Sequence, residues 1–153
     1  MVSVGDPAPS FSLPADDGSS LSLTDFTGRR LVVYFYPKDD TPGCTTQACE
    51  LRDDLPALSA LDVSVVGVSP DSVASHVKFK TKFDLNFPLL SDPEHVMSES
   101  FGVWKEKSMY GRTYMGIERS TFIIDEEGRI ARAWRKVKPR GHAEMIRDAL
   151  ADL

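Results

Sequence analysis

The two cysteines of this 153-residue chain, Cys44 and Cys49, lie five positions apart in a short segment that begins at Pro37. A thiolate is a nucleophile, and two neighbouring thiols can also exchange electrons by forming a disulfide. Two cysteines are too few for the disulfide framework of a secreted protein, and a reducing cytosol would keep both as thiols. We therefore expect the pair to be either chemically active or incidental, and not to hold the fold together.

Other cysteine chemistries fit the sequence less well. Zinc prefers four ligands, and the three histidines His76, His95 and His142 lie far along the chain from the cysteine pair. We therefore expect no metal site and no cofactor. The absence of a histidine near Cys44 also weakens the interpretation as a protease-like Cys-His pair.

A reactive cysteine needs help to ionise. A free thiol with a pKa of about 8.5 is only about 3% ionised at pH 7, and lowering that pKa to about 6 takes roughly 3.4 kcal/mol. A helix N-terminus typically supplies about 0.3 to 1 kcal/mol, and rarely more than about 2. We therefore expect an arginine from elsewhere in the fold beside Cys44. Nearby carboxylates would oppose ionisation, so Asp39 and Asp40 are expected to point to solvent.

The elements around the cysteines predict how Cys44 is presented. Residues 31–36 are apolar on both faces and stop at Pro37, which is typical of a strand in the centre of a sheet. A helix should follow, because Ala48, Leu51, Leu55 and Leu58 recur at three- and four-residue spacing. Cys44 then lies in the first helical turn at the carboxyl end of a strand, where ligands collect in α/β sheets.

The rest of the chain completes an α/β fold with a mixed central sheet, in one domain covering residues 1–153. A second buried strand at 63–68 makes a parallel βαβ unit with the first. Further expected elements are an N-terminal hairpin around residues 11–23, helices near 72–83 and 93–101, strands at 120–124 and 130–134, and a C-terminal amphipathic helix near 145–153.

Helix geometry restricts how the two cysteines could pair. Five residues along a continuous α-helix separate two Cα atoms by roughly 8.7 Å. A disulfide tolerates at most about 7 Å. If Cys44 and Cys49 do form a bond, the first turns of the helix must unwind, and the lack of a strong helix former before Gln47 makes this inexpensive.

Several motifs together resemble the peroxiredoxin family, and within it the Q type, also called bacterioferritin comigratory protein. The resemblance covers nearly the whole chain. Its motifs are Pro37, Thr41-Pro42-Gly43-Cys44-Thr45 with Cys49 five residues on, Gly5-Asp6-Pro7-Ala8-Pro9, Tyr110-Gly111-Arg112-Thr113-Tyr114 and Gly116-Ile117-Glu118-Arg119-Ser120-Thr121-Phe122.

The resemblance implies a thioredoxin-like fold and an antioxidant thiol peroxidase that reduces hydrogen peroxide and organic hydroperoxides. It assigns Cys44 as the peroxidatic cysteine, with Pro37, Thr41 and Arg119 around it. It also implies that Cys49 resolves the sulfenic acid of Cys44 as an intramolecular disulfide, that thioredoxin or a similar dithiol recycles the enzyme, and that the enzyme is a monomer.

Two other functions remain open at this point. A protein dithiol-disulfide oxidoreductase normally uses Cys-x-x-Cys, which is two residues shorter than the spacing here. A peroxide sensor would oxidise Cys44 quickly without turnover. The net charge of −5 argues against a nucleic-acid partner. The start of the chain lacks the pattern of a signal peptide and no stretch suits a membrane span, so we expect a cytoplasmic protein with no membrane partner.

Overall fold

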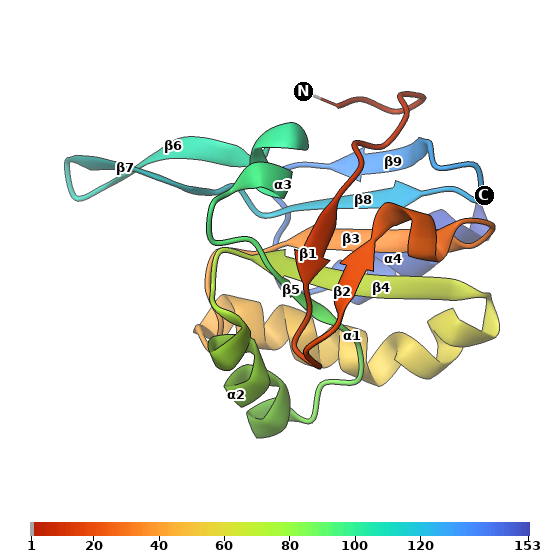
Figure 1. The fold of residues 1–153 in the computed structure, drawn as a ribbon, viewed down its shortest axis with the longest axis horizontal. Coiled ribbons are helices and arrows are strands. Elements are labelled where there is room, and N and C mark those ends of the chain that lie inside the picture. Colours follow the sequence, from red (N-terminus) through yellow and green to blue (C-terminus); the bar gives the residue numbers. More distant parts are fainter. Residues whose placement is uncertain (1) are drawn as a thin grey trace.

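The computed structural model describes residues 2–153 and is built around one five-stranded sheet (Figure 1). In spatial order its strands are β5 (Leu89–Ser91), β4 (Val63–Ser69), β3 (Arg30–Phe35), β8 (Ser120–Ile124) and β9 (Ile130–Trp134). β3, β4 and β5 run parallel, whereas β8 is antiparallel to β3 and β9 is antiparallel to β8. The predicted mixed sheet is therefore confirmed.

The central strand β3 is buried on both faces, as its apolar run predicts. Leu31, Val33 and Phe35 belong to one hydrophobic cluster. The alternate residues Val32 and Tyr34 belong to a second cluster on the opposite face of the sheet. Such a strand can hold the loop that follows it firmly, because both of its neighbours and both of its faces are occupied.

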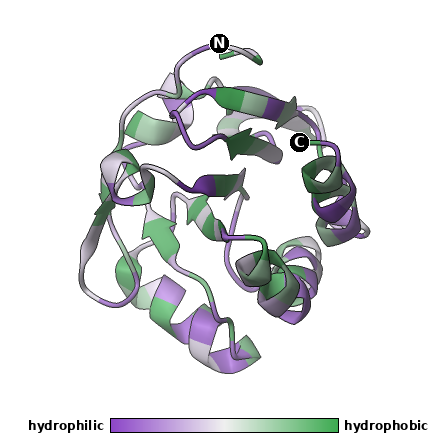
Figure 2. Cartoon of the chain, turned by 90° about the vertical axis from the view of Figure 1, so that its right-hand side faces the viewer, coloured by the Kyte–Doolittle hydropathy of each residue, from purple (hydrophilic) through white to green (hydrophobic). Residues whose placement is uncertain are grey.

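Helices cover one face of the sheet, and shorter elements cover the other. The first face carries α1 (Pro42–Ala60), α2 (Val73–Phe83) and α4 (His142–Ala151). The second carries the 3-10 helix η1 (Leu23–Phe26), α3 (Val96–Ser100) and the hairpin of β1 (Ser12–Pro14) and β2 (Ser20–Ser22). In Figure 2 the helices show both hydrophobic and hydrophilic residues, as expected for helices packed on one side.

Two differences from the sequence-based expectation concern short elements. The helix expected near 93–101 is confined to α3, because His95 takes a left-handed conformation with φ of 58° just before it. The buried carboxylate of Asp92 accepts the N–H of Ser98 at 2.9 Å and so fixes this start. The edge strand β5 was not predicted, because a strand of three residues is too short to show a period.

A second hairpin, also not predicted, projects from the body of the molecule (Figure 1). It consists of β6 (Trp104–Met109) and β7 (Arg112–Ile117). Its two-residue turn places Tyr110 and Gly111 at φ of 52° and 76°. Glycine suits such a turn, but tyrosine is uncommon there, so the sequence gives a weak hairpin signal. The hairpin matters because its second strand leads through Arg119 into β8. No helix within residues 2–153 is long and apolar enough to cross a membrane.

Candidate active site

Cys44 lies in the first turn of α1, directly beyond the carboxyl end of β3. Thr41 is the N-cap residue in an extended conformation, and Pro42 occupies the first helical position, where its missing N–H costs nothing. The first intrahelical bond runs from the N–H of Thr45 to the carbonyl of Thr41 at 2.8 Å. The N–H of Cys44 precedes this bond and is one of the amides that an α-helix leaves without an internal acceptor. The residue is 2% exposed.

An arginine lies beside the sulfur. Arg119 Nη2 donates to Cys44 Sγ at 3.2 Å, across 75 positions of sequence. Its other nitrogen, Nη1, donates to Gln47 Oε1 at 2.6 Å. The pairing of Ser120 with Phe35 in the antiparallel β8–β3 ladder brings Arg119 to the end of β3. The structure thus places Arg119 beside Cys44 Sγ, where the sequence analysis expected an arginine.

Gly43 has no side chain, and the guanidinium of Arg119 lies in the space where one would be. A Cβ atom added at Gly43 would lie 3.3 Å from Arg119 Nη2 and 3.1 Å from Pro139 Cγ. Both distances are tighter than ordinary van der Waals contact, and Pro139 is a rigid neighbour. A side chain at this position would therefore push the guanidinium away from the sulfur.

Thr41 and Pro37 lie on the loop that leads to Cys44. The hydroxyl of Thr41 donates to the carbonyl of Lys38 at 2.9 Å, which leaves its lone pairs free to accept a hydrogen bond from a bound molecule. Pro37 is half-buried and follows directly after the buried Tyr36. Within residues 2–153 the hydrogen bond to Cys44 Sγ comes from Arg119, whereas the Thr41 hydroxyl is directed to its own loop.

The expectation that Asp39 points to solvent is wrong. Its side chain is only 4% exposed. It accepts hydrogen bonds from the hydroxyls of Tyr36 at 2.6 Å and Ser75 at 2.8 Å, and it contacts His76 Nδ1 at 2.7 Å. These partners hold the carboxylate in the interior. Asp40 does face solvent, where it pairs with Lys82 at 2.8 Å.

Two residues of this site were missed by the sequence analysis. Gln47 is fully buried, and it fixes Arg119 through Oε1 while its Nε2 has no partner among the described residues. Its position three residues after Cys44, on the same face of a helix, was the available signal. Lys107 on β6 is the second: burial and the positive charge of Arg119 lower the pKa of Lys107. That lysine could be found only from the three-dimensional arrangement.

His142 is buried, and the positive charge of Arg119 acts on it as well as on Lys107. Burial, with a further contribution from the charge of Arg119, lowers the pKa of His142 to about 4 from the ordinary 6.5. Between these two pKa values the folded state keeps His142 neutral, whereas the unfolded state binds a proton. The contribution of neutral His142 to the free energy of unfolding is therefore complete above pH 6.5 and is lost as the pH falls toward 4.

We expect the free energy of unfolding of the wild type to fall by up to about 3 kcal/mol more between pH 6.5 and pH 4 than that of His142→Gln. Urea unfolding at a series of pH values measures this difference. His95→Gln is the matched control, because His95 stacks on Trp104 and is not among the groups around Cys44 and Arg119. Equal pH slopes for the wild type and His142→Gln would contradict the assignment.

Cys49 lies on the same continuous helix, is partly exposed and is a free thiol like Cys44. Along such a helix the two Cα atoms are about 8.7 Å apart, too far for a disulfide. The structure therefore represents a reduced state in which the two cysteines do not yet meet. Any bond between them requires the start of α1 to unwind.

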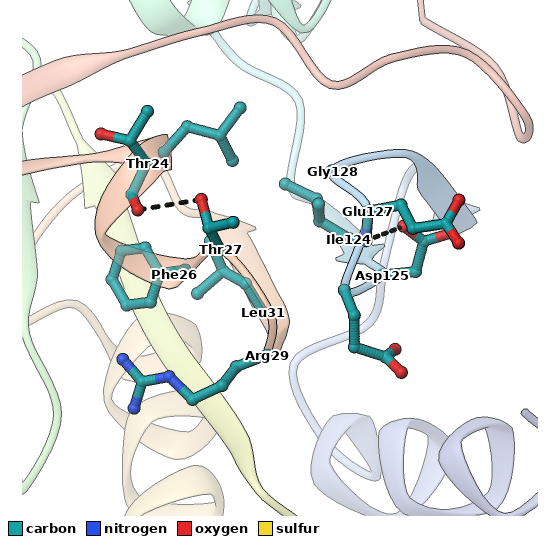
Figure 3. A pocket seen from close by; sticks show the side chains of 11 residues that line it. Thr24, Phe26, Thr27, Arg29, Leu31, Ile124, Asp125, Glu127 and Gly128 are labelled. Atoms are coloured by element: carbon teal, nitrogen blue, oxygen red, sulfur yellow. Dashed lines mark hydrogen bonds between the residues drawn. The ribbon is translucent and has the colours of Figure 1, made fainter.

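A separate cavity of about 280 Å³ lies at the opposite end of β3 (Figure 3). It is formed by η1, the start of β3 and the turn between β8 and β9, with Arg29, Asp125 and Glu127 in its wall. It contains neither cysteine. Within residues 2–153 no group of three or more histidine, cysteine, aspartate or glutamate side chains could hold a metal ion.

Comparison with known proteins gives a consistent result. Residues 4–133 match the model of the AhpC/TSA family. Peroxiredoxin Bcp of Bacillus subtilis is 49% identical over 152 residues, covering 99% of this chain and 97% of that protein. Peroxiredoxin Bcp of Escherichia coli is 48% identical over 145 residues, covering 95% and 93%.

Solved structures agree with this result. A mutant of Xylella fastidiosa PrxQ superposes with a TM-score of 0.95 at 41% identity, covering 99% of this chain and 97% of that one. The bacterioferritin comigratory protein of Xanthomonas campestris gives a TM-score of 0.92 at 41% identity, covering 98% of both chains. The thioredoxin-like fold is therefore confirmed. The chain belongs to the AhpC/TSA family and, within it, to the peroxiredoxins of the Q or bacterioferritin comigratory type.

Proposed function

We propose that this protein is a thiol peroxidase that reduces hydrogen peroxide and organic hydroperoxides, with Cys44 as the attacking residue. The observation that carries the proposal is the 3.2 Å contact of Arg119 Nη2 with Cys44 Sγ at the start of α1. The relative from Xanthomonas campestris is described as having alkyl peroxide reduction activity, which supports the substrate class.

In the first step the Cys44 thiolate attacks one oxygen of the hydroperoxide. The O–O bond breaks, and the attacked oxygen stays on sulfur with its hydrogen as a sulfenic acid. The other oxygen leaves as alkoxide or hydroxide and takes a proton from solvent to give an alcohol or water. Arg119 and the N–H of Cys44 donate to the peroxide oxygens as negative charge develops on them. The hydroxyl of Thr41, which donates its hydrogen bond to the carbonyl oxygen of Lys38, accepts a hydrogen bond from the peroxide O–H, and Pro37 shields the sulfur from water.

In the second step Cys49 resolves the sulfenic acid. Its thiolate attacks the sulfur of Cys44, an S–S bond forms, and the hydroxyl group leaves and is protonated to water. This step follows the unwinding that the helix requires. A dithiol protein, thioredoxin or a similar reductant, then supplies two electrons and two protons, is itself oxidised to a disulfide, and restores both cysteines.

We place the enzyme in the cytoplasm, where a reducing thiol pool keeps both cysteines free between cycles. We propose a single peroxiredoxin domain over residues 1–153 that acts as a monomer, with no nucleic acid, membrane, metal or cofactor taking part.

The test follows consumption of hydrogen peroxide with NADPH, thioredoxin reductase and thioredoxin as the electron source. Wild type should turn over continuously. Cys49→Ser should oxidise Cys44 once per chain and then stop, because no thiol remains to resolve the sulfenic acid. A Cys49→Ser enzyme that cycles at the wild-type rate would contradict the role of Cys49. Rapid oxidation of wild-type Cys44 without turnover on any dithiol would favour the sensor instead.

A further inference from the structure

The buried side chain of Asp39 joins the active-site loop to three other elements. Its carboxylate binds Tyr36 at the end of β3 and both Ser75 and His76 in α2. Its backbone N–H donates to Asp71 Oδ2 at 2.7 Å, just beyond β4. Asp71 Oδ2 in turn accepts from Ser69 Oγ at 2.7 Å. The chain is therefore held at Asp39 by both its side chain and its backbone.

His76 is charged in this arrangement, as its two ring nitrogens show. Nδ1 lies 2.7 Å from Asp39 Oδ2, and Nε2 lies 2.9 Å from the carbonyl oxygen of Leu90. Both partners are acceptors, so both nitrogens must carry protons. Burial lowers the pKa of His76, but the hydrogen bond and charge of Asp39 outweigh burial and raise it overall. Asp39 and His76 thus form a buried ion pair.

A second attachment holds α1 just after Cys49. The carboxylate of Glu50 accepts the backbone N–H of Gly141, the N-cap residue of α4, at 3.0 and 3.3 Å. The next residue, Leu51, is fully buried in the helix-covered core. From Glu50 onward, unwinding would break the contact with α4 and expose a large apolar side chain.

The ten residues between these attachments are held more weakly. The buried ones are Cys44, Gln47 and Ala48, which are small or polar. Releasing these three side chains exposes little apolar surface. Gln47 Nε2 has no hydrogen-bond partner among the described residues, and on release it would gain one from water. Side chains link the segment to the rest of the fold at two places, the contacts of Arg119 with Cys44 and Gln47 and the exposed pair of Asp40 with Lys82. Both cysteines lie in this segment.

We propose that Asp39, paired with His76, is a positioning residue that fixes the upstream end of the unwinding segment, so that residues 40–49 open between Asp39 and Glu50. The inference rests on the proposed disulfide between Cys44 and Cys49. With Asp39 fixed, the opened segment has less conformational freedom, and the folded form that reacts with peroxide is favoured. Release of Asp39 should extend the opening upstream and shift the balance toward the unwound form, in which Cys49 reaches Cys44.

Hydrogen exchange tests where the opening ends. Wild type is compared with Asp39→Asn, and with Asp40→Asn as a matched control. The control removes the same charge one residue away, where it forms an exposed ion pair with Lys82 that contributes little to stability. Each protein is measured reduced and after diamide has formed the disulfide. In the wild-type disulfide form, amides 45–49 should lose protection while the amides of Tyr36 and Asp39, bonded to Val68 and Asp71, keep it. Only in Asp39→Asn should the loss spread to Tyr36 and residue 39.

A kinetic measurement separates positioning from simple structural support. After excess peroxide, mass spectrometry gives the ratio of over-oxidised Cys44 to disulfide. We expect this ratio to fall by at least about threefold in Asp39→Asn, because a larger unwound population lets Cys49 react first. General damage to the fold would lower the melting temperature without lowering this ratio. Asp40→Asn should match wild type.

The outcomes are distinguishable. If wild type forms no disulfide between Cys44 and Cys49 with peroxide, the proposed function fails. If the disulfide forms but Asp39→Asn and Asp40→Asn behave alike in both measurements, the anchoring role of Asp39 is overturned. Should Asp39→Asn not fold, Ser75→Ala removes one of the hydrogen bonds to the carboxylate and leaves the ion pair in place. Raised exchange at Asp39 in that variant supports the proposal, and unchanged exchange overturns it.

Discussion

Replacing Cys44 with serine should abolish peroxide reduction, with a loss of at least about 10⁴-fold, as expected for removal of a nucleophile that forms a covalent intermediate. A serine hydroxyl is not ionised near neutral pH and forms no counterpart of the sulfenic acid. Arg119 would then donate to a neutral oxygen, and no step of the cycle could begin. The coupled thioredoxin assay and a direct competition assay for peroxide both measure the loss.

Cys49→Ser is the matched control for this variant, because it makes the same atomic change five residues along the same helix. It should keep one rapid oxidation per chain, whereas Cys44→Ser should have none. Thermal unfolding of both variants checks that the fold is retained. Measurable peroxide reduction by a folded Cys44→Ser protein would exclude Cys44 as the nucleophile.

Replacing Arg119 with methionine should slow the oxidation of Cys44 by about 10² to 10³-fold, the usual cost of removing one donor that stabilises developing charge. Arg119 is the side chain whose guanidinium touches both Cys44 Sγ and Gln47 Oε1. Arg119→Lys should recover part of the rate, because an ammonium keeps the charge but cannot make both contacts. Stopped-flow measurement of Cys44 oxidation against peroxide concentration gives the rate constants.

Arg112→Met provides the control for a change in net charge. Arg112 lies in the exposed start of β7, opposite Met109 beside the hairpin turn, and belongs to the same strand that leads to Arg119. Its loss should change the oxidation rate by less than about threefold, since exposed charges are screened by salt. If Arg119→Met and Arg112→Met have similar rates, Arg119 acts only through the overall charge and has no direct role in peroxide reduction.

The local sequence determined the frame of the active site. An apolar run ending at Pro37 specifies a buried strand, and the spacing of Ala48, Leu51 and Leu58 specifies a helix. Their junction puts Cys44 at a helix start, as the structure has it in α1. These features depend on neighbours within a few residues, so they could be predicted from the chain alone. The need for a cation followed from the small size of the helix dipole effect.

Tertiary structure decided which distant groups complete the site. The geometry of Arg119 and Gln47 around the sulfur depends on the pairing of β8 with β3, which brings Arg119 to Cys44 across 75 positions of sequence. The β6–β7 hairpin places Lys107 where burial and the nearby charge of Arg119 lower its pKa. Asp39 shows the limit of local rules most clearly. A charged residue is expected at the surface unless a partner compensates its burial, and the partner here is His76, 37 positions away. No pattern around Asp39 reveals that partner, because the pair exists only once α2 has packed against the end of β3.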